Sequence, residues 1–89
     1  MAPLIGMSVR ARNAVIAAVL EALEKGATKT MVMYSAGLSF TAAGEYLDLL
    51  IGNGLVEHQK EEEKYRLTKM GMEALQAYRE TGKIGPGLN

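Results

Sequence analysis

Basic residues occur at three places in the sequence where a phosphate group could be bound. Arg10 and Arg12 lie near the start of the chain and could contact a phosphate or an edge of a minor groove. Lys64 and Arg66 are two positions apart in an extended stretch, so both point to one face of a strand. Lys29 stands at the start of a short helical pattern, where backbone N–H groups and a lysine together suit an anion. The alternative for each residue is a solvated surface charge, and for Arg10 and Arg12 the two interpretations are balanced.

Small side chains accompany these charges. Thr30 either contributes to the same phosphate site or simply caps the short helix. Ser39 precedes a longer helical pattern, whose polar face carries Thr41, Ala42 and Glu45. Thr41 and Ala42 suit the methyl group of thymine, and Glu45 suits the amino group of cytosine. The alternative is the polar face of a purely structural helix, since a carboxylate repels phosphate.

No set of side chains in the sequence has the pattern of an active site or a metal site. The chain has no cysteine and a single histidine, His58, so a zinc site lacks ligands. The acidic run at 61–63 lacks the spaced oxygen ligands of a calcium loop. There is no Walker loop, no Gly-x-Ser-x-Gly turn and no Cys–His pair. The sequence therefore predicts a protein that is not an enzyme and holds no metal or cofactor.

The composition is that of one small globular domain. The chain has 89 residues, of which 48% are hydrophobic and 22% are charged. No apolar run approaches the roughly 20 residues that span a bilayer, and the first residues lack the pattern of a secretion signal. We therefore expect a cytoplasmic protein without membrane contact. Its ten basic and ten acidic residues give no net charge, so nucleic-acid binding would require basic residues gathered on one face.

The first helical pattern follows a short arm. Proline and glycine interrupt residues 1–8. Apolar residues then recur at spacings of three and four, at Val15, Ile16, Val19, Leu20 and Leu23. Ser8 or Asn13 is expected to cap this helix, and Gly26 is expected to end it.

A shorter and a longer helix come next. The shorter one spans about two turns, begins at Thr28 or Thr30 and ends at Gly37. Ser39 caps the longer one, which covers about 39–52. Its predicted core face consists of Phe40, Ala43, Leu47, Leu50 and Ile51. Its opposite face consists of Thr41, Ala42, Glu45, Asp48 and Leu49. Two helices joined by a tight turn make a helix-turn-helix.

A hairpin and a final helix complete the pattern. Residues 55–59 and 64–67 are predicted strands, and the charged stretch 60–63 is the turn between them. Thr68 caps the last helix, which ends at Gly82. Its apolar residues are Met70, Ala74, Leu75 and Tyr78.

The order helix, short helix, turn, helix, hairpin and helix predicts a winged helix-turn-helix. This fold is α+β and mainly helical, with a three-helix core, a two-stranded wing and a C-terminal helix. We expect the domain over 9–81, between the arm at 1–8 and a mobile, glycine-rich tail at 82–89.

Four motifs follow one another within about residues 10–78. They are Gly26-Ala27 before Thr28 and Thr30; Tyr46-Leu47-Asp48-Leu49-Leu50; Gly54-Leu55-Val56-Glu57; and Tyr65-Arg66-Leu67-Thr68-Lys69-Met70-Gly71. Their ordered spacing resembles a family of archaeal winged helix-turn-helix proteins, predicted to be transcriptional regulators. The resemblance implies DNA binding through the third helix and, as in some members, dimerisation through a long C-terminal helix. This chain departs from the family at Gly44 and Glu45, where members often carry lysines, and in its shorter last helix.

These observations predict a DNA-binding transcription regulator. The helix at about 39–52 would enter the major groove of double-stranded DNA, with the hairpin at 56–67 as the wing, and the protein would act as a homodimer. The alternative is a winged-helix module that binds a protein partner and has little affinity for DNA, which the zero net charge favours. The residues expected to contact DNA are Arg10, Arg12, Lys29, Thr30, Ser39, Thr41, Ala42, Glu45, Lys64 and Arg66.

Overall fold

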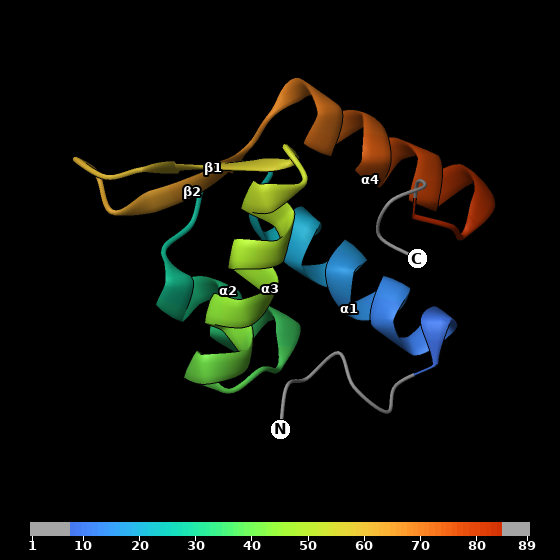
Figure 1. Ribbon diagram of the computed structural model, residues 1–89, viewed down its shortest axis with the longest axis horizontal. Helices are drawn as coiled ribbons and strands as arrows, with labels where there is room; N and C mark the ends of the chain where they lie inside the picture. The colour runs from blue at the N-terminus through green and yellow to red at the C-terminus, as the bar shows by residue number, and fades with distance from the viewer. Residues whose placement is uncertain (1–7, 85–89) are drawn as a thin grey trace.

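The computed structural model describes residues 8–84, which form four helices and one antiparallel hairpin (Figure 1). In chain order the elements are α1 (Val9–Ala22), α2 (Lys29–Ala36), α3 (Phe40–Gly52), β1 (Val56–Gln59), β2 (Lys64–Leu67) and α4 (Lys69–Thr81). This order confirms the predicted winged helix-turn-helix fold. Most of the predicted arm and tail lies outside the described residues. No helix within residues 8–84 is long and apolar enough to cross a membrane.

Each helix begins at a hydroxyl side chain that accepts a hydrogen bond from a backbone amide three residues later. This bond satisfies one of the amides that a helix start leaves without an intrahelical partner. The caps and donors are Ser8 with Ala11, Thr28 with Met31, Ser39 with Ala42 and Thr68 with Gly71, at 3.1, 3.2, 3.1 and 3.1 Å. Where the sequence left two candidates, the structure selects Ser8 over Asn13 and Thr28 over Thr30.

The first helix ends earlier than the sequence predicts. Its last residue is Ala22, with Leu23 as C-cap, and it does not extend to Gly26. The amides of Leu23 and Glu24 each donate to the carbonyl three residues back, at 3.0 and 3.3 Å, which tightens the chain into turns. Gly26 then adopts a positive φ of 82°. The glycine therefore ends this turn region, where its freedom to adopt positive φ is needed, and does not cap the helix.

The buried face of α3 is centred differently from the predicted one. Tyr46 has no exposed surface, although it was not among the predicted core residues. Phe40 and Ile51 were predicted to be buried but are 56% and 37% exposed. The buried positions of α3 are Ala43, Tyr46, Leu47 and Leu50. These positions are spaced by three, one and three residues. Phe40 and Ile51, which lie near the two ends of α3, therefore fall on the same edge of the buried face. Around it pack the apolar side chains Ile16, Val19, Leu20, Leu23, Val32, Leu55, Val56 and Leu75.

The hairpin is attached to the helices through a short bridge. In its register His58 lies opposite Tyr65, and Glu57 lies opposite Arg66. On the other edge of β2, the Ala27 amide donates to the Tyr65 carbonyl at 3.0 Å, and the Tyr65 amide donates back at 2.8 Å. The strand β2 is therefore held on both edges, which fixes the wing relative to the start of α2.

The last helix packs on α1, on the side of the molecule away from α2 (Figure 1). Its buried side is centred on Gly71 and Leu75, and the apolar Met70 beside Gly71 is 57% exposed. Gly71 is needed where it stands, because a Cβ there would collide with the carbonyl oxygen of Leu55. This close approach lets α4 start directly beneath the chain segment that leads into β1.

Ion pairs join the far end of α4 to the end of α1. Arg79 contacts Glu24 at 2.8 Å and Glu21 at 3.3 Å. The hydrogen bond from Arg79 lowers the pKa of Glu24 below 4.5, and the same contact raises the pKa of Arg79. These side chains are solvent-accessible, so the ion pairs connect α1 and α4 at the surface and are not part of the core. We call this contact between α1 and α4 the seam.

Candidate nucleic-acid interface

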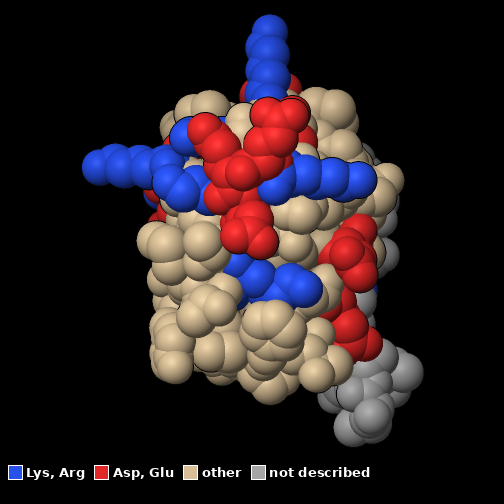
Figure 2. Space-filling model, turned by 90° about the vertical axis from the view of Figure 1, so that its left-hand side faces the viewer, with Lys and Arg blue, Asp and Glu red and all other residues tan. Residues whose placement is uncertain are grey.

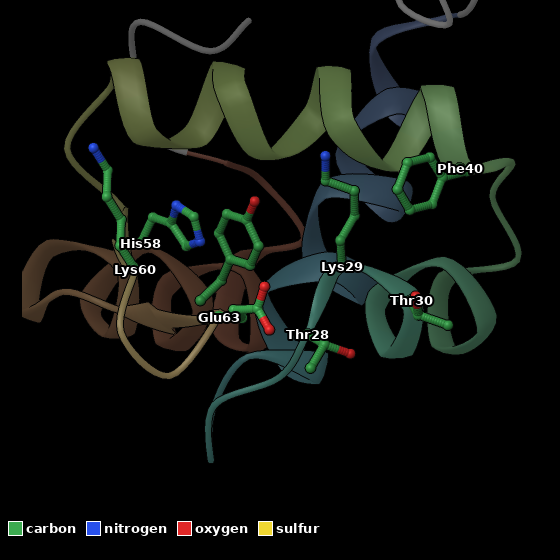
Figure 3. Close-up of a pocket in the computed structure, with 8 residues that line it drawn as sticks. Thr28, Lys29, Thr30, Phe40, His58, Lys60 and Glu63 are labelled. Atoms are coloured by element: carbon green, nitrogen blue, oxygen red, sulfur yellow. The ribbon is translucent and has the colours of Figure 1, made fainter.

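A hollow of about 490 Å³ lies between the starts of α2 and α3 and the wing (Figure 3). It is lined by Thr28, Lys29 and Thr30 before and within α2, by Phe40 of α3, and by His58, Lys60, Glu63 and Tyr65 of the wing. Segments far apart in the sequence thus supply one surface, because the bridge beside β2 holds the wing against the start of α2.

Lys29 crosses from α2 to α3 within this hollow. Its ammonium lies 4.9 Å from the centre of the Phe40 ring, which is the geometry of a cation–π contact. The same ammonium lies 3.6 Å from the place where a Cβ at position 44 would be, so the absent side chain of Gly44 leaves it room. Figure 3 shows the Lys29 side chain rising from the start of α2 toward α3, beside Phe40.

The wing contributes an aromatic pair and a second lysine. The rings of His58 and Tyr65 stack across the two strands with centroids 4.3 Å apart and planes 8° apart. Lys60 extends toward α3 from the turn of the hairpin (Figure 3). Glu63, which adopts a positive φ of 54° in the same turn, also lines the hollow. The wing side therefore combines a lysine, a carboxylate and a stacked pair of rings.

Of the residues predicted on α2 and α3, Lys29 and Thr30 line the hollow. Thr30 lines it and is exposed, and its hydroxyl is not the cap of α2. Thr41 is exposed on α3, whereas Ala42 and Glu45 are half-buried. Ser39 is exposed too, but its hydroxyl already accepts the amide of Ala42. Thr41 thus has the freest contact surface among the predicted residues of α3.

The two predicted cations of β2 lie on the other face of the hairpin. Lys64 and Arg66 do point the same way, as the alternation of the strand predicts, but Tyr65 between them is the residue that lines the hollow. Arg66 is half-buried; its Nε donates to Gln59 at 2.8 Å, and its guanidinium packs close to Gly26. Lys64 is exposed. Of these two residues, Lys64 is the exposed cation, and it lies on the face of the wing away from the hollow.

The two predicted arginines of α1 also lie away from the hollow. In Figure 1 the first turn of α1 is at the opposite side of the molecule from the wing. Arg10 is exposed there. Arg12 is half-buried, and its Nε and Nη2 atoms are buried without a hydrogen-bond partner in the described part of the chain. Burial raises the pKa of Tyr46, and the positive charge of the nearby Arg12 opposes that shift.

The charges on the wing side of the molecule are distributed unevenly. Figure 2 shows basic and acidic side chains gathered where the hairpin points toward the viewer. Below them the surface has a basic spot at its centre, acidic side chains along its right-hand side and uncharged residues elsewhere. The turn carries Lys60 and the three glutamates at 61–63, followed by Lys64. Helix α3 contains no lysine or arginine and carries Glu45 and Asp48. The cations of this side thus come from α2 and the wing.

Six of the eight residues that line the hollow were not among the predicted contacts: Thr28, Phe40, His58, Lys60, Glu63 and Tyr65. Phe40 was predicted to be buried. The alternation of β2 did contain a signal, since it places Tyr65 on the face opposite Lys64 and Arg66. The hairpin register then adds His58 to the face of Tyr65.

Comparison with known proteins agrees with this geometry. Residues 9–85 match a family described as winged helix-turn-helix. An uncharacterised protein of the archaeon Methanocaldococcus jannaschii is 36% identical over 63 residues, which cover 70% of this chain and 63% of that protein. The matched segment thus spans less than two thirds of that relative's length. A winged helix-turn-helix is a fold associated with DNA binding, and the family match supports that broad function.

Proposed function

The chain belongs to the winged helix-turn-helix family, and from that premise we propose that it is a transcription regulator that inserts α3 into the major groove of duplex DNA. The observation that carries the proposal is the hollow between α2, α3 and the wing. Lys29 and Lys60 point into it, and neither forms an ion pair within residues 8–84. Cations that are not neutralised within the fold are available to phosphate or to base edges.

The exposed ridge of α3 would face the bases in this arrangement. Thr41 supplies a methyl group and a hydroxyl, and Glu45 supplies an acceptor for cytosine. Lys60 and Lys64 would approach the backbone from the two faces of the wing. Because net charge is zero, we expect a surface of few phosphate contacts and a shallow dependence of affinity on salt.

Fluorescence anisotropy with a labelled random duplex at several salt concentrations tests this proposal. We expect binding at low salt that weakens as salt rises. Thr41→Glu should weaken binding by about tenfold or more, because it places a carboxylate against the groove. Ala14→Glu is the matched control, since it makes the same charge change at an exposed position of α1. A chain that ignores duplex DNA at low salt, or equal effects of both variants, would contradict the proposal.

The outer face of α4 supports a homodimer as the acting form. Its exposed side carries a shallow hollow lined by Lys69, Met72, Glu73, Gln76, Ala77 and Glu80. These residues are self-complementary in an antiparallel pair of α4 helices: Lys69 meets Glu80 of the second copy, and Met72 meets its Ala77. Such a pairing satisfies two-fold symmetry, in which the same patch serves both subunits.

A charge exchange distinguishes this dimer from other associations. Lys69→Glu should weaken the dimer in sedimentation equilibrium, because it sets two carboxylates against each other. Adding Glu80→Lys should restore the dimer by reversing both members of each pair. A monomeric wild-type protein at high concentration, or no restoration by the second change, would contradict the α4 interface.

A second candidate function is protein binding by the same surface. The observation that favours it is exposed apolar area on α2 and α3, where Met31, Tyr34 and Phe40 are 53%, 77% and 56% exposed and Phe40 lines the hollow. Aromatic and methionine side chains are enriched where proteins contact each other. If the random duplex does not bind and Phe40→Asp abolishes capture of one defined cellular protein, this function replaces DNA binding.

A further inference from the structure

Helix α3, which we propose enters the major groove, carries no cationic side chain. Helix α3 contains no lysine or arginine, and its polar side chains include two carboxylates, Glu45 and Asp48. The commonest specific contact of proteins with a base pair is a lysine or arginine at the O6 and N7 atoms of guanine. On this helix such a contact has to come from a neighbouring element.

Lys29 supplies a cation to α3 from outside the helix. Its ammonium lies 4.9 Å from the centre of the Phe40 ring and 3.6 Å from the Cβ position at Gly44. Phe40 and Gly44 are one helical turn apart, so the side chain lies along the edge of α3 that faces the wing. Figure 3 shows it turned toward α3, although its backbone belongs to the start of α2.

Two features of α3 hold the ammonium at this place. The Phe40 ring attracts the positive charge through its π face. Phe40 itself is 56% exposed, so a ligand can also contact this residue. Gly44 has no side chain that would push the lysine outward. Within residues 8–84 no carboxylate forms an ion pair with Lys29, although Glu63 lines the same hollow and Glu45 follows Gly44 on α3.

We propose that Lys29 is a specificity-determining residue that recognises guanine in the major groove, held over α3 by Phe40 and Gly44. This inference rests on the proposed function, since it requires α3 to enter the groove. The ligand is duplex DNA with a guanine facing the start of α3. A phosphate contact by the same lysine is the competing role, because the start of α2 also suits an anion.

The two roles predict different effects of substituting Lys29. Loss of a base contact lowers the affinity for duplexes with one particular guanine, whereas loss of a phosphate contact lowers the affinity for all duplexes alike. A preferred duplex is first selected from a random library with the wild-type protein. Affinity is then measured for that duplex and for versions in which each guanine pair is replaced. We expect one guanine whose replacement weakens wild-type binding by about 5-fold to 150-fold, the range for a good base contact. Lys29→Met should bind the original and that replacement equally well.

Control variants separate base reading from phosphate binding. Lys60→Met removes the second lysine of the hollow and should weaken binding to all duplexes alike, with a lower salt slope. Phe40→Leu keeps an apolar side chain but removes the ring, so it should reduce the guanine preference and leave the salt slope unchanged. Circular dichroism of each variant establishes that the helices are retained.

The outcomes decide between the roles. Loss of the preference at one guanine in Lys29→Met, with all preferences kept in Lys60→Met, supports the proposal. A uniform loss of affinity in Lys29→Met, with the guanine preference kept, overturns it and leaves DNA binding intact. Absence of duplex binding by the wild-type protein overturns both this inference and the proposed function.

Discussion

Two regions of the molecule, the contact between α1 and α4 and the hollow between α2, α3 and the wing, differ in how their charges are paired. At the seam between α1 and α4, Arg79 is paired with Glu24 and Glu21 and shifts the pKa of Glu24 downward. In the hollow between α2, α3 and the wing, Lys29 and Lys60 have no ion pair within residues 8–84. The charges between α1 and α4 pair within the fold, whereas the two lysines of the hollow form no ion pair within residues 8–84 and, under the proposed function, contact DNA. A chain with no net charge can therefore still present unpaired cations to an anionic ligand, provided that its acidic residues lie mainly at other places on the surface.

The strongest disruption of both regions should come from the core that they share. Leu47 is 1% exposed beneath α3, among residues of α1 and the wing strand. Leu47→Ala should lower the free energy of unfolding by about 2–5 kcal/mol, through lost burial and the cavity left behind. Urea denaturation measures this change. Thr41→Ala on the exposed side of the same helix should stay within about 0.5 kcal/mol, and a similar loss in both variants would mean that α3 is not packed as described.

A smaller loss of stability is expected where α4 begins, close to Leu55. Gly71→Ala puts a Cβ against the carbonyl of Leu55, which forces α4 or the segment before β1 to move. We expect a loss of about 2 kcal/mol in unfolding free energy, although alanine is the better helix former. Gly52→Ala is the matched control, since a Cβ there meets nothing within 4 Å. Equal stability of the two variants would show that α4 does not start so close to Leu55.

The ion pairs of the seam should contribute a still smaller, pH-dependent effect. Glu24 has a pKa below its ordinary 4.5, so its contribution is present above that value and is lost as pH falls through the lower folded-state pKa. Arg79→Gln should therefore destabilise the protein slightly at pH 7, and the difference between the two proteins should shrink at an acidic pH well below 4.5, where Glu24 becomes protonated. Thermal denaturation at the two pH values measures the difference. A gap that is unchanged at low pH would assign the effect of Arg79 to packing.

The smallest effect on stability is expected in the hollow, where stability and DNA affinity should respond differently to the same change. Replacing both Lys29 and Lys60 by methionine removes two cations that form no ion pair within residues 8–84. We expect the unfolding free energy to change by no more than about 0.5 kcal/mol. The same double variant should lose most of its affinity for duplex DNA. A large loss of stability would mean that the two lysines are structural residues like Arg79.

Local sequence signals predicted most of the fold, because caps and turns depend on neighbouring residues. Ser39 before an apolar period and Gly37 in the preceding turn mark α3 without any knowledge of the rest of the chain. The period of three and four also predicts that α3 has a buried face. It does not decide where that face is centred. For this reason Phe40 was expected in the core but is exposed, whereas Tyr46 was not among the expected core residues but is buried.

The candidate site was predicted less completely because it depends on contacts between distant segments. Alternation along β2 predicts that Lys64 and Arg66 share a face. Which face meets α2 is decided by the bridge from Ala27, and this bridge turns Tyr65 inward. Likewise, Lys29 was identified as a cation at the start of α2. Its position over Phe40 depends on the packing of two helices and on the absence of a side chain at Gly44.

The bridge between Ala27 and Tyr65 also has a dynamic consequence. It joins strand β2 of the wing to a residue only two positions before Lys29, through two reciprocal hydrogen bonds. The wing therefore cannot swing away without freeing both amides and loosening the start of α2 at the same time. In deuterium exchange the two amides should be released in one opening event, and their shared rate would report how often the hollow comes apart in solution.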